Sequence, residues 1–115
     1  MVGTELSKES VEKVYEMIEI AKASGKIRKG TNEVTKALER GQAKLVAIAN
    51  DVSPAEIVMH LPILAKEKNI VAVQVGSKAE LGAAASLDVG TTTVAIIDEG
   101  DAKEQLKKVL ASLKE

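Results

Sequence analysis

A short cationic segment that runs into a glycine turn is the part of this sequence best suited to contact with an anionic partner. Three cations, Lys26, Arg28 and Lys29, come just before Gly30 and Thr31, and polar residues follow. A helix that begins at this turn would point free N–H groups and the positive end of its dipole outward, an arrangement that favours phosphate. The segment therefore predicts a site for a phosphate-bearing ligand, and we interpret that ligand as RNA.

The first turns of the same helix carry side chains that can read base edges. Asn32 and Lys36 are four residues apart and project from one face, with Glu33 about 100° round from Asn32. Lysine donates to guanine, glutamate accepts from base amino or imino groups, and asparagine can do either. Regular A-form RNA hides these edges in a deep, narrow groove, so only RNA that is bent or opened by non-canonical pairs would be read. The alternative is an ordinary polar first turn that binds nothing.

A second candidate contact is the stretch Leu87-Asp88-Val89-Gly90, which we expect in a loop before the last strand. It would expose two branched apolar side chains that can pack against an extruded nucleobase. The alternative is that these side chains fold back into the core. Lys78, at an expected helix start, is a further candidate for phosphate, with a solvated lysine as its alternative.

The sequence lacks the residue patterns of an enzyme or a metal site. His60, the sole histidine, has no serine or cysteine partner and no metal-ligand spacing around it, so we interpret it as structural. The glycines form neither of the common glycine-rich phosphate loops. Nothing combines a nucleophile, a base and an oxyanion site. We therefore predict no catalysis, no cofactor and no bound metal.

Positive charge is concentrated in one stretch of an otherwise acidic chain. The 115 residues have a net charge of −1, but residues 22–44 carry +5, while residues 1–21 and 45–115 carry −3 each. A local positive field steers an anionic partner even when the net charge is negative. A chance fluctuation on a solvated surface is the alternative that charge alone leaves open.

Several missing features narrow the class of protein. The chain has no cysteine, which agrees with a reducing compartment, and we expect a cytoplasmic location. No apolar run reaches the length of a membrane span and the N-terminus lacks a signal-peptide pattern, so we expect no membrane association. Tyr15 is the only aromatic residue, which argues against RRM-type or OB-type surfaces that stack bases on aromatic rings.

Helix and strand signals alternate along the chain. Apolar periodicity, capping boxes at 53–56, 77–80 and 101–104, and glycine stops predict helices over residues 6–24, 31–40, 53–68, 77–85 and 101–113. Pro62 should kink or split the third of these helices near His60. Buried strands are predicted over 26–29, 45–49, 70–75 and 93–97. The alternation predicts an α/β fold, a three-layer α-β-α sandwich with a small mixed central sheet, as one domain over residues 1–115.

The order of these motifs resembles the L-seven-Ae ribosomal protein family of archaea, which binds kink-turn RNA. Residues 26–41 look like the signature of that family, and further similar stretches follow in the same order at 43–46, 48–52, 57–62, 77–78, 81–82, 87–90 and 94–97. The resemblance covers residues 7–113. It implies an α/β/α sandwich that recognises kink-turns and kink-loops, where tandem sheared G·A pairs lie beside a flipped-out bulge nucleotide.

The resemblance also implies a role for each candidate residue. In the family, a polar trio reads the G·A pairs, a turn brings backbone amides to the RNA, nearby cations contact phosphates, and an apolar loop covers the bulged nucleotide. The trio corresponds here to Asn32, Glu33 and Lys36, and the turn corresponds to Gly30 and Thr31. Phosphate contacts fall to Lys26, Arg28, Lys29 and Lys78, and the loop to Leu87, Asp88 and Val89.

The partners implied by the resemblance are ribosomal RNA, box C/D and H/ACA guide RNA, and ribonuclease P RNA, with the other subunits of those ribonucleoprotein particles. We expect a monomer, because no long apolar heptad pattern invites self-association. Two other interpretations stay open. One is a module of the same fold that contacts only proteins, and the other is a small enzyme that binds a phosphate ligand.

The chain departs from the family pattern at a few positions. Ala65 stands in place of a cysteine, Val71 and Ala72 in place of a Pro-Tyr pair, and Ala83 in place of a lysine. The lost lysine implies one phosphate contact fewer, and the other changes are expected to repack the core. None of them touches the polar trio or the apolar loop, so we expect RNA binding.

Overall fold

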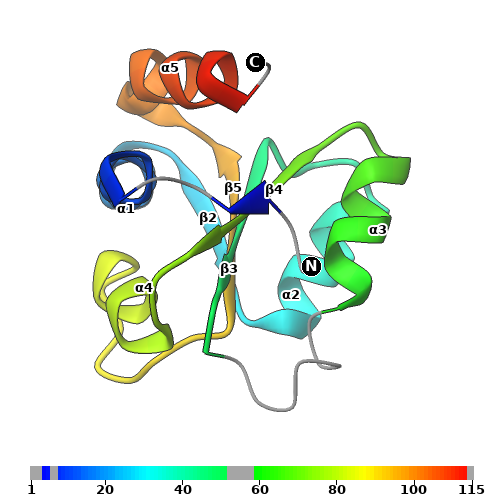
Figure 1. The fold of residues 1–115 in the computed structure, drawn as a ribbon, viewed down its shortest axis with the longest axis horizontal. Helices are drawn as coiled ribbons and strands as arrows, with labels where there is room; N and C mark the ends of the chain where they lie inside the picture. Colours follow the sequence, from blue (N-terminus) through cyan, green and yellow to red (C-terminus); the bar gives the residue numbers. More distant parts are fainter. Residues whose placement is uncertain (1–3, 6–7, 52–58, 114–115) are drawn as a thin grey trace.

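The computed structural model describes residues 4–5, 8–51 and 59–113, which form a mixed sheet between two layers of helices (Figure 1). The strands of these residues are β1 (Thr4–Glu5), β2 (Lys26–Lys29), β3 (Leu45–Ala49), β4 (Val71–Val75) and β5 (Thr93–Asp98). Their order in the sheet is β1-β4-β3-β5-β2. β1 and β3 run parallel to β4, whereas β5 runs antiparallel to β3 and β2. The predicted three-layer α-β-α sandwich is confirmed.

Helices cover both faces of the sheet (Figure 1). One layer consists of α1 (Lys8–Ser24), α4 (Lys78–Ala84) and α5 (Lys103–Leu113), and the other of α2 (Thr31–Glu39) and α3 (His60–Glu67). Strand β3 is buried at all five positions. Leu45 and Ala47 belong to the core under α1, α4 and α5, whereas Val46 and Ile48 belong to the core under α2 and α3. Alternate strand residues point to opposite faces, so an uninterrupted apolar strand fills both cores.

Two helix ends follow the glycine signals closely. Helix α1 ends at Ser24, just before Gly25, and α2 ends at Glu39, two residues before Gly41. Gly41 has a φ of +67°, the left-handed conformation that glycine adopts without a Cβ clash. These ends confirm the predicted stops.

The predicted helix starts have mixed outcomes. The Ser77 cap is confirmed, because its Oγ accepts a hydrogen bond from the Glu80 amide at 3.1 Å. The predicted cap at Asp101 is wrong, since this residue lies inside a 3-10 turn, η2 (Gly100–Ala102), that precedes α5. The Asp101 amide donates to Ser24 Oγ at 2.9 Å, so a contact with the end of α1 shapes this turn. The predicted box at 53–56 lies outside the described residues.

Pro62 lies at the start of α3, and three of the replaced family positions lie in or against the core. Helix α3 begins at His60, so Pro62 lies in its first turn, where a missing N–H costs no helix hydrogen bond. Ala65 lies on the buried face of α3, and Val71 and Ala72 pack against the two cores. These three positions lie in or against the core, and the expected repacking relative to the family stays a prediction.

Candidate nucleic-acid interface

Most of the candidate residues gather at one end of the sheet. Strands β2, β3 and β4 all run toward this end, and β5 starts from it. The end therefore contains the turn after β2, residues 50–51 after β3, the start of α4 after β4, and the loop 86–92 before β5. We call this the binding end of the sheet.

The turn between β2 and α2 leaves backbone donors open. Gly30 has a φ of +90°, which favours glycine, and its amide donates to the Thr93 carbonyl at 2.9 Å. Gly30 is the N-cap of α2, and no side chain caps the helix there. The first amides of a helix have no partner within it. The amides of the first turn of α2 are therefore available to a ligand.

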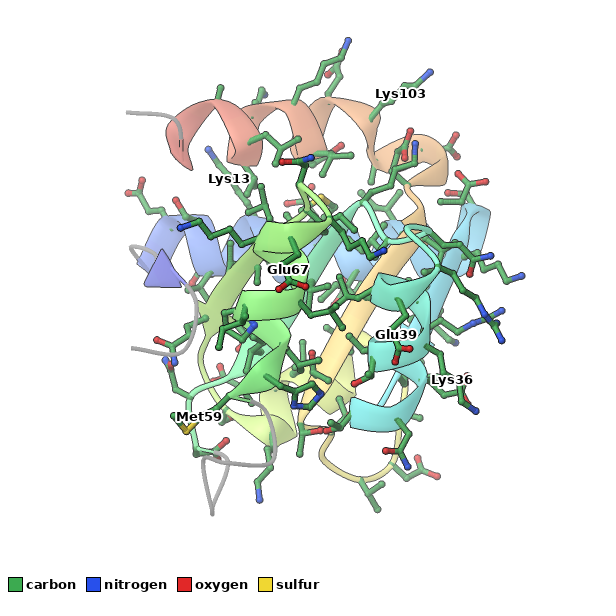
Figure 2. All side chains as sticks on the ribbon, turned by 90° about the vertical axis from the view of Figure 1, so that its right-hand side faces the viewer. Lys13, Lys36, Glu39, Met59, Glu67 and Lys103 are labelled. Atoms are coloured by element: carbon green, nitrogen blue, oxygen red, sulfur yellow. The ribbon has the colours of Figure 1, made fainter. Side chains whose placement is uncertain are left out.

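The polar trio lies on the solvent face of α2, as the spacing predicts. Asn32, Glu33 and Lys36 are all exposed, while the opposite face buries Val34, Ala37 and Leu38. Lys36 Nζ lies 3.8 Å from Glu33 Oε1, and the two side chains are 60% and 54% exposed. An ion pair between side chains this exposed adds little stability, so either side chain can leave the other and contact a ligand instead. Figure 2 shows Lys36 projecting from α2 into solvent.

Hydroxyl groups hold the first turn of α2 in place. Thr31 Oγ1 lies 2.8 Å from Thr92 Oγ1, a hydrogen bond that joins the turn to the residue before β5. Thr35 Oγ1 donates to the Thr31 carbonyl at 2.7 Å and lies 2.9 Å from His60 Nε2. Since Thr35 has only one proton to give, the imidazole must donate in this contact, which assigns the N–H of His60 to Nε2. The geometry agrees with a structural role for His60.

The backbone of Lys78 is held from both sides. Its amide donates to Asp51 Oδ1 at 2.8 Å, and its carbonyl accepts from the Thr91 amide at 3.1 Å. A Cβ at Gly90 would lie 3.0 Å from the Cβ of Lys78, so the loop passes close to the start of α4. These contacts fix the loop 86–92 against α4.

The prediction that this loop exposes two apolar side chains is correct for Val89 and wrong for Leu87. Val89 is 72% exposed, whereas Leu87 is half-buried and packs against the core on the α1 side of the sheet. The Leu87 amide donates to the Gly82 carbonyl at 2.8 Å, directly after α4, and this bond keeps the residue beside the core. Asp88, between them, is exposed.

The cations of the basic segment are divided between the two ends of β2. Lys29 precedes Gly30 directly, and Arg28 is the next residue back along the strand. Lys26 lies opposite Asp98 of β5 in the sheet register, at the far end of the strand and about 10 Å from Lys29. The structure therefore places Arg28, Lys29 and Lys78 at the binding end and leaves Lys26 away from it.

Sequence reasoning missed several supporting residues, Asp51, Thr91 and Thr92 among them. Tyr15 is another, because its hydroxyl accepts from the Gly76 amide at 2.9 Å and so ties α1 to the end of β4. Burial raises the pKa of the Tyr15 hydroxyl, and the hydrogen bond from Gly76 partly offsets this effect. Asp51 and Tyr15 act on residues 27 and 61 positions away, which no local pattern signals.

Two further kinds of feature were sought over the described ranges. No group of three or more His, Cys, Asp or Glu residues there could hold a metal ion. Likewise, none of the helices described is both long and apolar enough to cross a membrane.

Comparison with known proteins shows the family. A model of the ribosomal protein L7Ae/L30e/S12e/Gadd45 family matches residues 12–106, which include α2, α4 and the loop 86–92. Among solved structures, the Giardia lamblia 15.5kD RNA binding protein is similar with a TM-score of 0.89 and 29% sequence identity. That similarity covers 95% of this chain and 91% of the other. This chain therefore belongs to the ribosomal protein L7Ae/L30e/S12e/Gadd45 family.

Proposed function

We propose that this protein binds kink-turn RNA at the binding end of the sheet and stabilises its bent form. The observation that carries the proposal is the union of two features at this end. One is the uncapped first turn of α2 with its exposed polar trio, and the other is the loop that exposes Val89. Hydrogen bonds from Gly30 to Thr93 and between Thr31 and Thr92 join the two features. Membership of the family and the similarity to an RNA binding protein support the proposal.

Each part of the binding end has a chemical role in this proposal. Asn32, Glu33 and Lys36 contact the edges of the sheared G·A pairs, where the groove is open enough for a helix end. The free amides of α2 bind phosphate oxygens, together with Arg28, Lys29 and Lys78. Val89 covers the flipped-out nucleotide, and Leu87 supports it from the core side.

The mechanism that follows is a shift of population rather than catalysis. A free kink-turn exchanges between extended and kinked forms. A protein that binds only the kinked form draws the RNA toward it by the difference in binding free energy between the two forms. On this proposal the protein acts as a monomer in the large ribosomal subunit, in box C/D and H/ACA particles and in ribonuclease P, and it performs no reaction.

A paired titration tests the proposal. One labelled RNA contains the kink-turn, and the second has its G·A pairs replaced by Watson–Crick pairs. We expect at least tenfold tighter binding to the first RNA, because each lost base contact costs about 1–3 kcal/mol. Equal, weak and steeply salt-dependent binding to both RNAs would refute it and favour a module of the same fold that contacts only proteins.

A further inference from the structure

The loop 86–92 and helix α4 lie so close together that they form one structural unit. A Cβ at Gly82, inside α4, would lie 2.3 Å from the Val89 carbonyl oxygen, so the loop backbone approaches the helix where a larger residue would clash. The Leu87 amide also donates to the Gly82 carbonyl at 2.8 Å. In Figure 1 the loop, drawn in yellow, lies beside α4 and leads into β5. The position of Val89 therefore depends on the position of α4.

One side chain joins the start of α4 to the end of β3. The Lys78 amide, at the first residue of α4, donates to Asp51 Oδ1 at 2.8 Å, and Asp51 comes two residues after β3. The Lys78 carbonyl accepts from the Thr91 amide at 3.1 Å, so the residue that Asp51 holds also holds the end of the loop. Asp51 itself is exposed, so it acts through this contact rather than through packing in the core. Hydrogen bonds therefore connect β3, α4 and the loop in series.

The two helix starts at the binding end differ in how their first amides are used. In α4, side chains take two of them, because Ser77 Oγ accepts from the Glu80 amide at 3.1 Å and Asp51 accepts from the Lys78 amide. In α2, no side chain caps the start. Amides that are already bonded within the protein are not open to a phosphate. The contact with Asp51 therefore fixes the place of α4 and does not prepare its amides for RNA.

We infer that Asp51 is a positioning residue for the contact between Val89 and the flipped-out nucleotide. The inference rests on the proposed function and adds to it a residue that acts through Lys78 and the loop. Without the Asp51 oxygen, the start of α4 loses its bond to the end of β3, and the loop with Val89 is free to shift. The polar trio is held separately, through the hydrogen bonds of Gly30 and Thr31. Loss of Asp51 should therefore weaken the contact with the flipped-out nucleotide and spare the contact with the G·A pairs.

The test compares two kink-turn RNAs that differ only at the flipped-out position, which is an ordinary nucleotide in one RNA and an abasic residue in the other. The unaltered protein should bind the first RNA about fivefold more tightly, because Val89 covers apolar surface of the base. Asp51→Ala should bring this ratio of affinities close to one, since the loop is no longer held. The ratio does not depend on the folded fraction, because both RNAs are titrated with the same preparation.

Two further variants serve as controls. Asp51→Asn removes the same charge as Asp51→Ala but keeps an oxygen that can accept the Lys78 amide, so it should retain the ratio of the unaltered protein. Lys36→Ala, on the polar trio, should weaken binding to both RNAs by the same factor and should retain the ratio as well.

Three outcomes overturn the inference. An unchanged ratio in Asp51→Ala would limit Asp51 to the stability of the fold. An equal loss of the ratio in Asp51→Asn would assign the effect to the charge of Asp51 rather than to its hydrogen bond with Lys78. A ratio close to one in the unaltered protein would mean that the loop does not cover the nucleotide. Failure of the proposed function gives a different result, since the unaltered protein would then bind the kink-turn and its Watson–Crick control equally.

Discussion

The turns at the two ends of the sheet differ in whether side chains accept hydrogen bonds from their backbone amides. At the binding end, α2 starts at Gly30 without a side-chain cap, and its polar trio stands in solvent. At the other end, the turn after β5 is closed by internal hydrogen bonds. Ser24 Oγ accepts from the Asp101 amide, and Asp98 Oδ1 accepts from the Gly100 amide at 2.9 Å.

The turn at the closed end stabilises the fold, whereas the turn at the binding end leaves backbone amides open to a ligand. In the closed turn, the amides of Gly100 and Asp101 are already hydrogen-bonded to side chains of this protein and are not available to a ligand. An open helix start forgoes the roughly 1 kcal/mol of a side-chain cap and keeps its amides available. Mutations at the closed end should therefore change stability with little effect on RNA binding, and mutations of exposed side chains at the binding end should do the reverse.

Gly25→Ala at the closed end should have the largest effect. A Cβ there would lie 2.1 Å from the Asp98 carbonyl oxygen, and backbone would have to move. We expect a loss of about 3 kcal/mol in the free energy of unfolding, measured by urea denaturation. Gly41→Ala is the matched control, since a Cβ there meets no atom within 4 Å, and its left-handed φ should cost only about 1 kcal/mol. Equal losses would contradict the steric explanation.

Lys36→Ala at the binding end should give the opposite result. Its side chain is 60% exposed, so the free energy of unfolding should change by less than about 0.5 kcal/mol. The free energy of binding to a kink-turn should fall by about 2 kcal/mol, measured by fluorescence anisotropy. Unchanged affinity would remove Lys36 from the proposed site, and Asn32→Ala tests the same face independently.

Thr92→Val should affect both properties, because it breaks the link inside the binding end. The valine keeps the shape of the side chain but loses the hydrogen bond to Thr31. We expect losses of about 1 kcal/mol in unfolding and in kink-turn binding. Thr92→Ser retains the hydroxyl and should restore both quantities. Restoration of stability without restoration of affinity would show that the hydroxyl pair does not position the RNA site.

The variants Lys26→Ala and Lys29→Ala should differ in the salt dependence of RNA binding, because the two lysines lie at opposite ends of β2. Removal of Lys29, beside Gly30, should reduce the slope of log affinity against log salt by about 1. Lys26 lies opposite Asp98 in the register of β2 and β5, at the closed end, so its removal should leave the slope nearly unchanged. Equal slopes for the two variants would mean that the RNA extends along the whole of β2.

The smallest effect concerns Tyr15, which supports the binding end from the core side. Its raised pKa means that the folded protein holds the phenolic proton more firmly than the unfolded chain. Its stabilising effect is therefore complete below pH 10.0, the ordinary value, and is lost as the pH rises through the folded pKa. Absorbance at alkaline pH reports this single tyrosine directly. A midpoint below the ordinary value would contradict its burial.

Local signals in the sequence account for the helices and strands better than for the site. The glycine stops of α1 and α2 and the apolar strand β3 depend on neighbouring residues, and they were predictable. The cap at Asp101 was mispredicted because Ser24, far along the chain, accepts its amide. The distance of Lys26 from the turn follows from the extended conformation of β2, which the predicted strand over 26–29 already implied.

In the site, too, features that depend on neighbouring residues were predictable and features that depend on distant contacts were not. Exposure of the polar trio followed from helical spacing, because the buried stripe on the other face of α2 is equally periodic. The burial of Leu87 depends on a hydrogen bond to α4, and the Thr31–Thr92 pair joins residues 61 positions apart. Contacts of this range are a property of the packed fold.

The place of β2 in the sheet has a consequence for the order in which the protein forms. Within the described residues, β2 is an edge strand whose neighbour is β5, near the end of the chain. A chain synthesised only as far as residue 92 contains the whole polar trio but lacks the strand that holds β2 and accepts the Gly30 amide. Long-range pairing of this kind is completed late. On the proposed function, a growing chain therefore carries the polar trio well before it can present these residues to RNA, and it acquires the ability to bind only when β5 has emerged.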